Sequence, residues 1–158
     1  MERGVGLMKR EKKIEAIIDV GGKSDIRRIA LATGIITLQE KTIFAIKNNE
    51  IKKGDVIEAS TIAVIQAVKD TPRIIPHCHI VPIDGCSVDW NFEGQNLRCT
   101  VEVSANYRTG VEMEALVGVS AGLLCVFDMV KSYEKDESGQ YPEAQINDIK
   151  VLSKKKLI

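Results

Sequence analysis

The sequence predicts an α+β protein in which helices pack on one face of a largely antiparallel sheet. Three observations lead to this prediction: a segment rich in β-branched residues, a pair of alternating segments joined by a turn, and one long apolar helical stretch. The chain has 158 residues, of which 44% are hydrophobic and 28% charged, and this profile fits one soluble domain. We therefore expect a single domain over residues 1–158, with mobile termini near 1–15 and 153–158.

The predicted elements follow the order β, α, α, β, β, α, β. The segment from Asp25 to Leu38 is rich in β-branched residues, and most of it is expected to form a strand. Residues 39–50 favour a short helix. A second helix opens at Asp55, carries one apolar stripe and is expected to end at Pro72, since proline lacks the backbone N–H that a helix needs. A last strand is expected from Gln145 to Leu152.

Apolar and polar residues alternate cleanly in two segments between residues 86 and 103, as they do in half-buried strands of a hairpin. If the hairpin closes symmetrically, Trp90 lies opposite Cys99 and Cys86 lies opposite Val103. The two thiols are then small core residues and not partners in a disulfide.

Charge and composition limit the possible partners and location. The 22 basic and 22 acidic side chains cancel, so the total charge gives no reason to expect nucleic acid or an anionic membrane as a partner. No uninterrupted apolar run reaches the roughly 18 residues of a membrane span, and the N-terminal residues lack the apolar stretch of a secretory signal. Four scattered cysteines suit a reducing compartment. We expect a cytoplasmic protein.

From Gly110 to about Glu134 the chain is apolar on nearly every side of a predicted helix, which indicates burial all round. In so small a domain, such burial points to contacts with another subunit. Four ionisable residues nevertheless lie on this helix, where a charge is costly unless it is paired, exposed or functional: Glu112, Glu114, Asp128 and Lys131.

The spacing of these charged residues allows two interpretations. Asp128 and Lys131 are three residues apart and can form a structural ion pair on one helix face. Alternatively, they belong to a functional site together with Glu114. Because Glu114 lies about 21 Å from Asp128 along the helix axis, one small-molecule site that uses both must be completed by a second subunit.

Both histidines of the chain, His77 and His79, flank Cys78. In extended backbone the two imidazoles share a face, but a closed zinc site needs four ligands and the other cysteines are explained as core residues, so we expect no metal ion. A polar pocket in which imidazoles donate hydrogen bonds or carry protons is favoured over histidines that only decorate a loop. The string VGGKS (20–24), in a different part of the sequence, lacks the first glycine of a phosphate-binding loop and leads into a strand.

Five strings carry a resemblance that spans nearly the whole chain in order: IIDVGGK (17–23), KKGDV (52–56), VKDTPRIIPHCHI (68–80), RTGVEMEALVGVS (108–120) and FDMVK (127–131). They resemble the cyclic pyranopterin monophosphate synthase family of molybdenum cofactor biosynthesis. The resemblance implies a ferredoxin-like core and a hexamer of three dimers with active sites at the dimer interfaces. It also implies that a cyclised dihydro-GTP intermediate is rearranged to a pterin, while its triphosphate closes to a cyclic phosphate with loss of diphosphate.

The resemblance also assigns site residues. Its catalytic aspartate falls on Asp128 and its essential lysines fall on Lys53 and Lys131. The substrate-binding candidates are His77, Cys78, His79, Met113, Glu114, Glu112, Lys69 and Asp19. No cofactor is required by this assignment, and a Mg²⁺ ion bound with the triphosphate is left open. The sequence departs from the family at three positions, where the family usually has Leu, Pro and Arg: His77, Ile80 and Asp70.

Two other classes of function compete with this one. A ferredoxin-like regulatory domain can bind a nucleotide or pterin without turning it over, since fold does not fix function. Such a binder has no need for Asp128 and Lys131 on an apolar helix. An RNA-binding sheet needs aromatic residues on its open face and a basic surface, whereas Trp90 and Phe92 alternate onto the core face.

Overall fold

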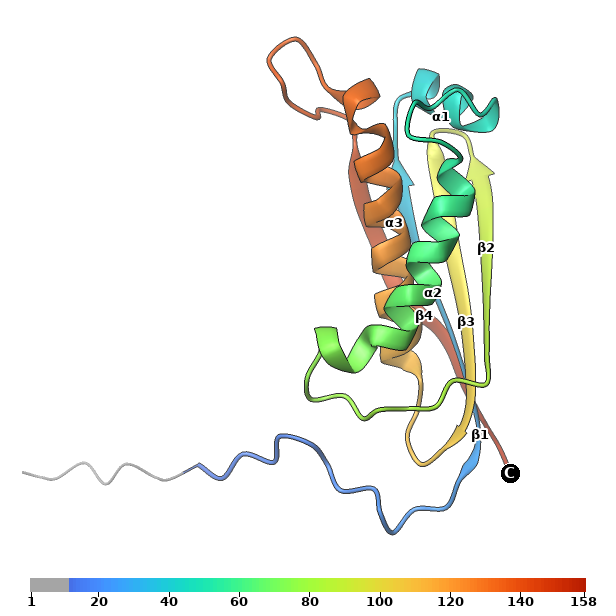
Figure 1. Cartoon of the computed structure of the whole chain (residues 1–158), viewed down its shortest axis with the longest axis vertical. Coiled ribbons are helices and arrows are strands. Elements are labelled where there is room, and N and C mark those ends of the chain that lie inside the picture. Colours follow the sequence, from blue (N-terminus) through green and yellow to red (C-terminus); the bar gives the residue numbers. More distant parts are fainter. Residues whose placement is uncertain (1–11) are drawn as a thin grey trace, which may run out of the picture.

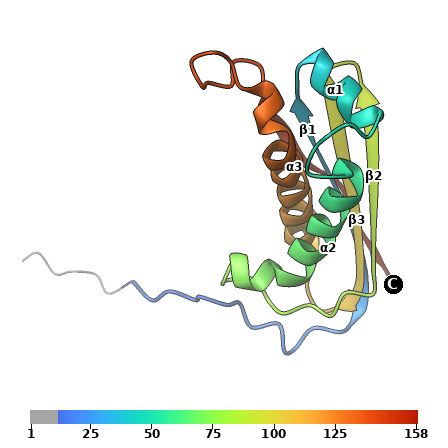
Figure 2. The same cartoon turned by 45° about the horizontal axis from the view of Figure 1, so that its top comes forward.

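The computed structural model describes residues 12–158. The elements are β1 (Ile26–Thr37), α1 (Glu40–Lys47), α2 (Val56–Ile74), β2 (Gly85–Glu93), β3 (Asn96–Tyr107), α3 (Glu112–Glu134) and β4 (Gln145–Leu157). The four strands form one antiparallel sheet in the order β2-β3-β1-β4. The long helices α2 and α3 lie side by side on one face of this sheet (Figures 1 and 2). The predicted α+β fold, a ferredoxin-like antiparallel sheet with helices on one face, is confirmed.

The register of the β2–β3 hairpin is the predicted one. Trp90 pairs with Cys99, and Cys86 pairs with Val103. The turn after Glu93 uses Gly94 at φ +62°, a left-handed conformation that glycine adopts without steric cost. All four cysteines are free thiols.

Helix α2 does not end at Pro72, as we expected, but continues to Ile74. Proline at this position leaves the carbonyl of Val68 without its usual backbone donor four residues later. The side-chain hydroxyl of Thr71 donates to that carbonyl at 3.1 Å, and the backbone N–H of Ile75 still donates to the carbonyl of Thr71 at 2.8 Å. The helix therefore passes through the proline because a threonine hydroxyl supplies the missing hydrogen bond.

The last strand also runs further than the sequence predicts. It was expected to end at Leu152 and to be followed by a mobile tail, but β4 continues to Leu157, and Ser153 to Leu157 pair with residues 27–31 of β1. At the other end of the chain, residues 1–11 of the predicted mobile tail lie outside the described residues. Residues 12–15 have no regular secondary structure.

Helix α3 forms the centre of the core because glycines let it approach its neighbours closely. A Cβ atom added at Gly122 would lie 2.6 Å from a methyl group of Val64 on α2, and one added at Gly34 of β1 would lie 2.9 Å from side chains of α3. Side chains along one stripe of α3 are fully buried. By length and a mean hydropathy of 1.8, α3 would suffice to cross a membrane, but half of that window is buried in this fold, as in the core helix of a globular domain.

Candidate active site

The predicted site residues lie mainly in two groups at opposite ends of α3, the helix labelled in Figure 1. The group at the C-terminal end, which we call the lysine cluster, consists of Lys53, Asp128 and Lys131. The group at the N-terminal end, which we call the histidine hollow, contains the substrate-binding candidates His77, Cys78, His79, Glu112, Met113 and Glu114. Helix geometry keeps Glu114 and Asp128 of one chain about 21 Å apart.

In the lysine cluster, two ammonium groups hold one carboxylate. Lys131 Nζ donates to Asp128 Oδ1 at 2.9 Å, and Lys53 Nζ donates to Asp128 Oδ2 at 2.8 Å and to the backbone carbonyl of Asp128 at 3.1 Å. The hydrogen bond from Lys131, followed by that from Lys53, lowers the pKa of Asp128 to about 2. The same contact raises the pKa of Lys131. At neutral pH the cluster therefore presents an ionised carboxylate between two cations.

A purely structural ion pair explains this cluster poorly. The side chains of Asp128, Lys53 and Lys131 are each about half exposed, at 56%, 51% and 47%. Ion pairs between such exposed groups add little to folding stability. The fold therefore has little to gain from an aspartate with two lysines, whereas an anionic ligand would meet both cations.

Lys53 reaches Asp128 from a tight turn between α1 and α2. The backbone N–H of Gly54 donates to the carbonyl of Ile51 at 3.0 Å, and Gly54 has φ +111°, which a residue with a side chain rarely adopts. Asp55 then caps α2 by accepting a hydrogen bond from the backbone N–H of Glu58 at 2.9 Å. The KKGDV string thus encodes a turn and a helix start that present Lys53 to α3.

The histidine hollow has a volume of about 220 Å³ and is lined by the loop after α2 and the first turn of α3. Glu114 in its wall is only 3% exposed. Burial raises the pKa of Glu114, and the nearby charge of Glu112 raises it further. Burial also raises the pKa of Cys78. His79 Nε2 lies 2.6 Å from the carbonyl oxygen of Ile18, so the segment that precedes β1 is held against this hollow.

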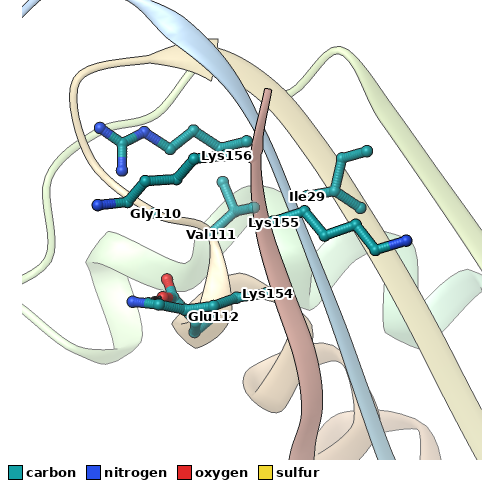
Figure 3. A pocket seen from close by; sticks show the side chains of 8 residues that line it. Ile29, Gly110, Val111, Glu112, Lys154, Lys155 and Lys156 are labelled. Atoms are coloured by element: carbon teal, nitrogen blue, oxygen red, sulfur yellow. Dashed lines mark ion pairs between the residues drawn. The ribbon is translucent and has the colours of Figure 1, made fainter. Parts of the chain in front are cut away.

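Glu112, two residues before Glu114, has a different environment. Its Oε1 accepts a hydrogen bond from Lys154 Nζ on β4 at 2.8 Å (Figure 3). Burial alone would raise the pKa of Glu112, but the hydrogen bond from Lys154 and the charge of Arg28 lower it overall. Lys154 was not among the predicted site residues, because residues 153–158 were expected to form a mobile tail. Residues 153–157, SKKKL, do not alternate between apolar and polar, so no local pattern indicated that they extend β4.

Two candidates belong to neither group but lie beside the histidine hollow. Lys69 is exposed near the end of α2 and lines a separate hollow with Ile17 and Cys78. Asp19 is exposed and accepts a hydrogen bond from the backbone N–H of Gly21 at 2.8 Å. Within residues 12–158, neither side chain bonds to another predicted site residue, and no group of three or more His, Cys, Asp or Glu residues is placed to hold a metal ion.

These features define a class of protein: a ferredoxin-like α+β domain whose long core helix carries charged groups at both of its ends. The chain belongs to the MoaC family, whose model matches residues 17–156. It is 49% identical over 146 residues to a protein of Thermococcus kodakarensis named "Probable cyclic pyranopterin monophosphate synthase", covering 92% of this chain and 94% of that one. Proteins with the same name from Methanospirillum hungatei and Archaeoglobus fulgidus are 48% and 49% identical over 140 residues each, covering 89% of this chain and 90% of theirs.

Proposed function

We propose that this chain is a cyclic pyranopterin monophosphate synthase, a lyase of molybdenum cofactor biosynthesis. It would convert (8S)-3′,8-cyclo-7,8-dihydroguanosine 5′-triphosphate into cyclic pyranopterin monophosphate and diphosphate. The names of its relatives support this function. The structural observation that carries it is the ionised Asp128, held between Lys53 and Lys131 on an exposed surface where stability gains little.

The lysine cluster has the groups that this reaction requires. Ring opening and ring formation need proton transfers, which positioned acids and bases accelerate by roughly 10²- to 10⁴-fold each. Asp128, with its pKa lowered to about 2, is ionised at neutral pH and holds both ammonium groups in place. It would become a stronger base, able to accept a proton, when the substrate phosphates draw the two ammonium groups away from it. In the phosphate step, a substrate hydroxyl oxygen attacks the α phosphorus, the bond to the diphosphate breaks and the hydroxyl proton passes to a base. The ammonium groups of Lys53 and Lys131 would neutralise the departing diphosphate, as would a Mg²⁺ ion carried by the triphosphate.

The histidine hollow would hold the ring system of the substrate. Glu114 keeps its proton to a higher pH than an ordinary glutamate does and therefore suits the role of a proton donor. His77, Cys78, His79 and Met113 line the same hollow, and Glu112 lies at its edge beside Lys154. Lys69 and Asp19 would contribute from the adjoining surface and from the segment that precedes β1.

We further propose that the two groups meet across a dimer interface, in a cytoplasmic hexamer of three dimers. The separation of about 21 Å along α3 supports this arrangement, because one small molecule cannot span both groups within a chain. Apolar side chains that a single chain leaves exposed also support it; they include Ile62 on α2 at 61% and Leu124 on α3 at 58%. Four free thiols suit the reducing cytoplasm.

The first experiment is incubation of the purified protein with the enzymatically made cyclised intermediate, followed by detection of the oxidised pterin product. We expect product from the natural chain and at least 100-fold less from Asp128→Asn. Asp136→Asn is the matched control, because Asp136 is also an exposed aspartate but accepts its hydrogen bonds from its own loop. Binding of the intermediate without turnover by the natural chain would favour the regulatory domain instead.

A second experiment tests the shared site. Glu114→Ala and Lys131→Ala chains, each inactive alone, are unfolded, mixed and refolded together. If each site combines the hollow of one subunit with the lysine cluster of another, some sites in mixed oligomers contain both intact groups and regain activity. Absence of any recovery in oligomers shown to be mixed would place the whole site in one chain.

A further inference from the structure

The turn that carries Lys53 is bound to α3 by a side chain outside the proposed catalytic groups. Tyr133 lies in the last turn of α3, and its Oη accepts a hydrogen bond from the backbone N–H of Lys52 at 3.2 Å. The same hydroxyl donates to the backbone carbonyl of Glu50 at 3.3 Å. One phenol group therefore bridges the two ends of a three-residue stretch immediately before Lys53.

The position of this backbone decides whether Lys53 reaches Asp128. Lys53 is the third residue of the turn that closes through the hydrogen bond from Gly54 to Ile51. Its side chain is long and exposed, and confining such a side chain to one conformation costs rotamer entropy. The contact with Asp128 is thus favoured only while the turn holds the start of the side chain at a fixed distance from α3.

We propose that Tyr133 is a positioning residue for Lys53: its hydroxyl fixes the backbone from Glu50 to Lys52 on α3, so that the ammonium group of Lys53 stays on the Asp128 carboxylate. The contribution of this contact to turnover rests on the proposed function. The placement of Lys53 itself does not, and it can be measured without substrate.

The geometry favours positioning over a purely structural role. The tyrosine ring packs against the hydrophobic core, and phenylalanine would preserve this packing. Only the hydroxyl would be lost. Its two backbone partners belong to exposed residues, so water can take the place of the hydroxyl as their hydrogen-bond partner. Tyr133→Phe should therefore loosen the turn without unfolding the domain.

The substrate-free test is a pH titration of the Asp128 carboxyl carbon by NMR. Both lysines lower the pKa of Asp128. If the Lys53 ammonium group leaves the carboxylate for part of the time, the pKa of Asp128 therefore rises. We expect a higher titration midpoint in Tyr133→Phe than in the natural chain. We also expect no further rise when Tyr133→Phe is added to Lys53→Met, because the tyrosine acts through Lys53 alone. An unchanged midpoint, or an equal rise in both backgrounds, would overturn the proposal.

The kinetic test compares Tyr133→Phe with Tyr107→Phe. Tyr107 lies at the end of β3, and its hydroxyl makes no hydrogen bond within residues 12–158. We expect kcat to fall about 10-fold in Tyr133→Phe with KM within about twofold, because misplacing a catalytic group slows the reaction more than it weakens binding, and no change in Tyr107→Phe. Equal kcat values for the two variants would overturn the positioning role. If the natural chain forms no product at all, the proposed function fails, and the carboxyl titration still decides whether Tyr133 places Lys53.

Discussion

Helix α3 has one buried carboxylate near each end, and the two differ in their partners. Glu134 at the C-terminal end is fully buried, and its side-chain oxygens accept hydrogen bonds from the backbone N–H of Gln39, at 3.1 Å, and from the hydroxyl of Thr42. Glu114 at the N-terminal end is almost as buried, at 3% exposed, but faces the histidine hollow. Within residues 12–158, no other side chain donates a hydrogen bond to it.

This difference distinguishes Glu134, which the fold uses, from Glu114, for which we propose a role in the reaction. A buried carboxylate costs free energy unless donors satisfy it. Glu134 meets that condition, and its hydrogen bonds join the end of α3 to the start of α1. Glu114 does not, and burial therefore raises its pKa. Burial alone would have marked both residues as candidates, whereas the hydrogen-bond partners distinguish them.

The largest effect we expect is on turnover, from Glu114→Gln. This change keeps the size and polarity of the side chain but removes its proton exchange, so turnover of the cyclised intermediate should fall by roughly 10²- to 10⁴-fold. Steady-state kinetics together with circular dichroism would measure it. Activity within threefold of the natural chain, in a folded protein, would show that Glu114 is no more catalytic than Glu134.

The second expectation concerns Glu134. Glu134→Ala leaves the Gln39 N–H and the Thr42 hydroxyl without their buried acceptor, which should destabilise the fold by about 3 kcal/mol. For a chain of this size the melting temperature should fall by roughly 10 °C. Activity per folded molecule should change far less than in Glu114→Gln. A melting temperature within 2 °C of the natural value would mean that these hydrogen bonds contribute little.

Sequence patterns predicted those parts of this comparison that depend on local spacing. The alternation of residues around Trp90 placed it opposite Cys99, and the three-residue spacing of Asp128 and Lys131 predicted their contact. The resemblance assigned Lys53 to the site, but its contact with Asp128 joins residues 75 positions apart, and no local pattern reports such a pairing. The partners of Glu134 and the hydroxyl contact of Tyr133 escaped prediction for the same reason.

The third expectation is a pH dependence of stability that distinguishes Glu114 from an ordinary surface glutamate. Burial raises its folded-state pKa above the ordinary value of 4.5, so in the window between these two values the folded state holds more protons than the unfolded state. Stability from this group is therefore lost as the pH rises through that window, and the loss persists at higher pH. Glu114→Gln should melt at the natural temperature below about pH 4 and at a higher temperature near neutral pH.

Thermal melts from about pH 3 to pH 8 would measure this divergence. The control is Glu137→Gln, which alters an exposed glutamate of the loop after α3. Parallel curves for Glu114→Gln and the natural chain would mean that the folded state does not disfavour the ionised Glu114. A gain in stability combined with a loss of activity is the pattern expected of a residue retained for function.

The smallest expected effect comes from Lys154→Met, which removes the hydrogen bond that makes Glu112 differ from Glu114. The pKa of Glu112 should then rise, because burial would no longer be opposed by the Lys154 ammonium. Since the Lys154 side chain is 61% exposed, the free energy of unfolding should change by less than about 1 kcal/mol. Titration of the Glu112 carboxyl carbon by NMR would measure the shift, and Lys155→Met, on the adjacent residue of β4, is the matched control. An unchanged titration of Glu112 would mean that Lys154 does not form this hydrogen bond in solution. The opposite pKa shifts of Glu112 and Glu114 would then have another cause.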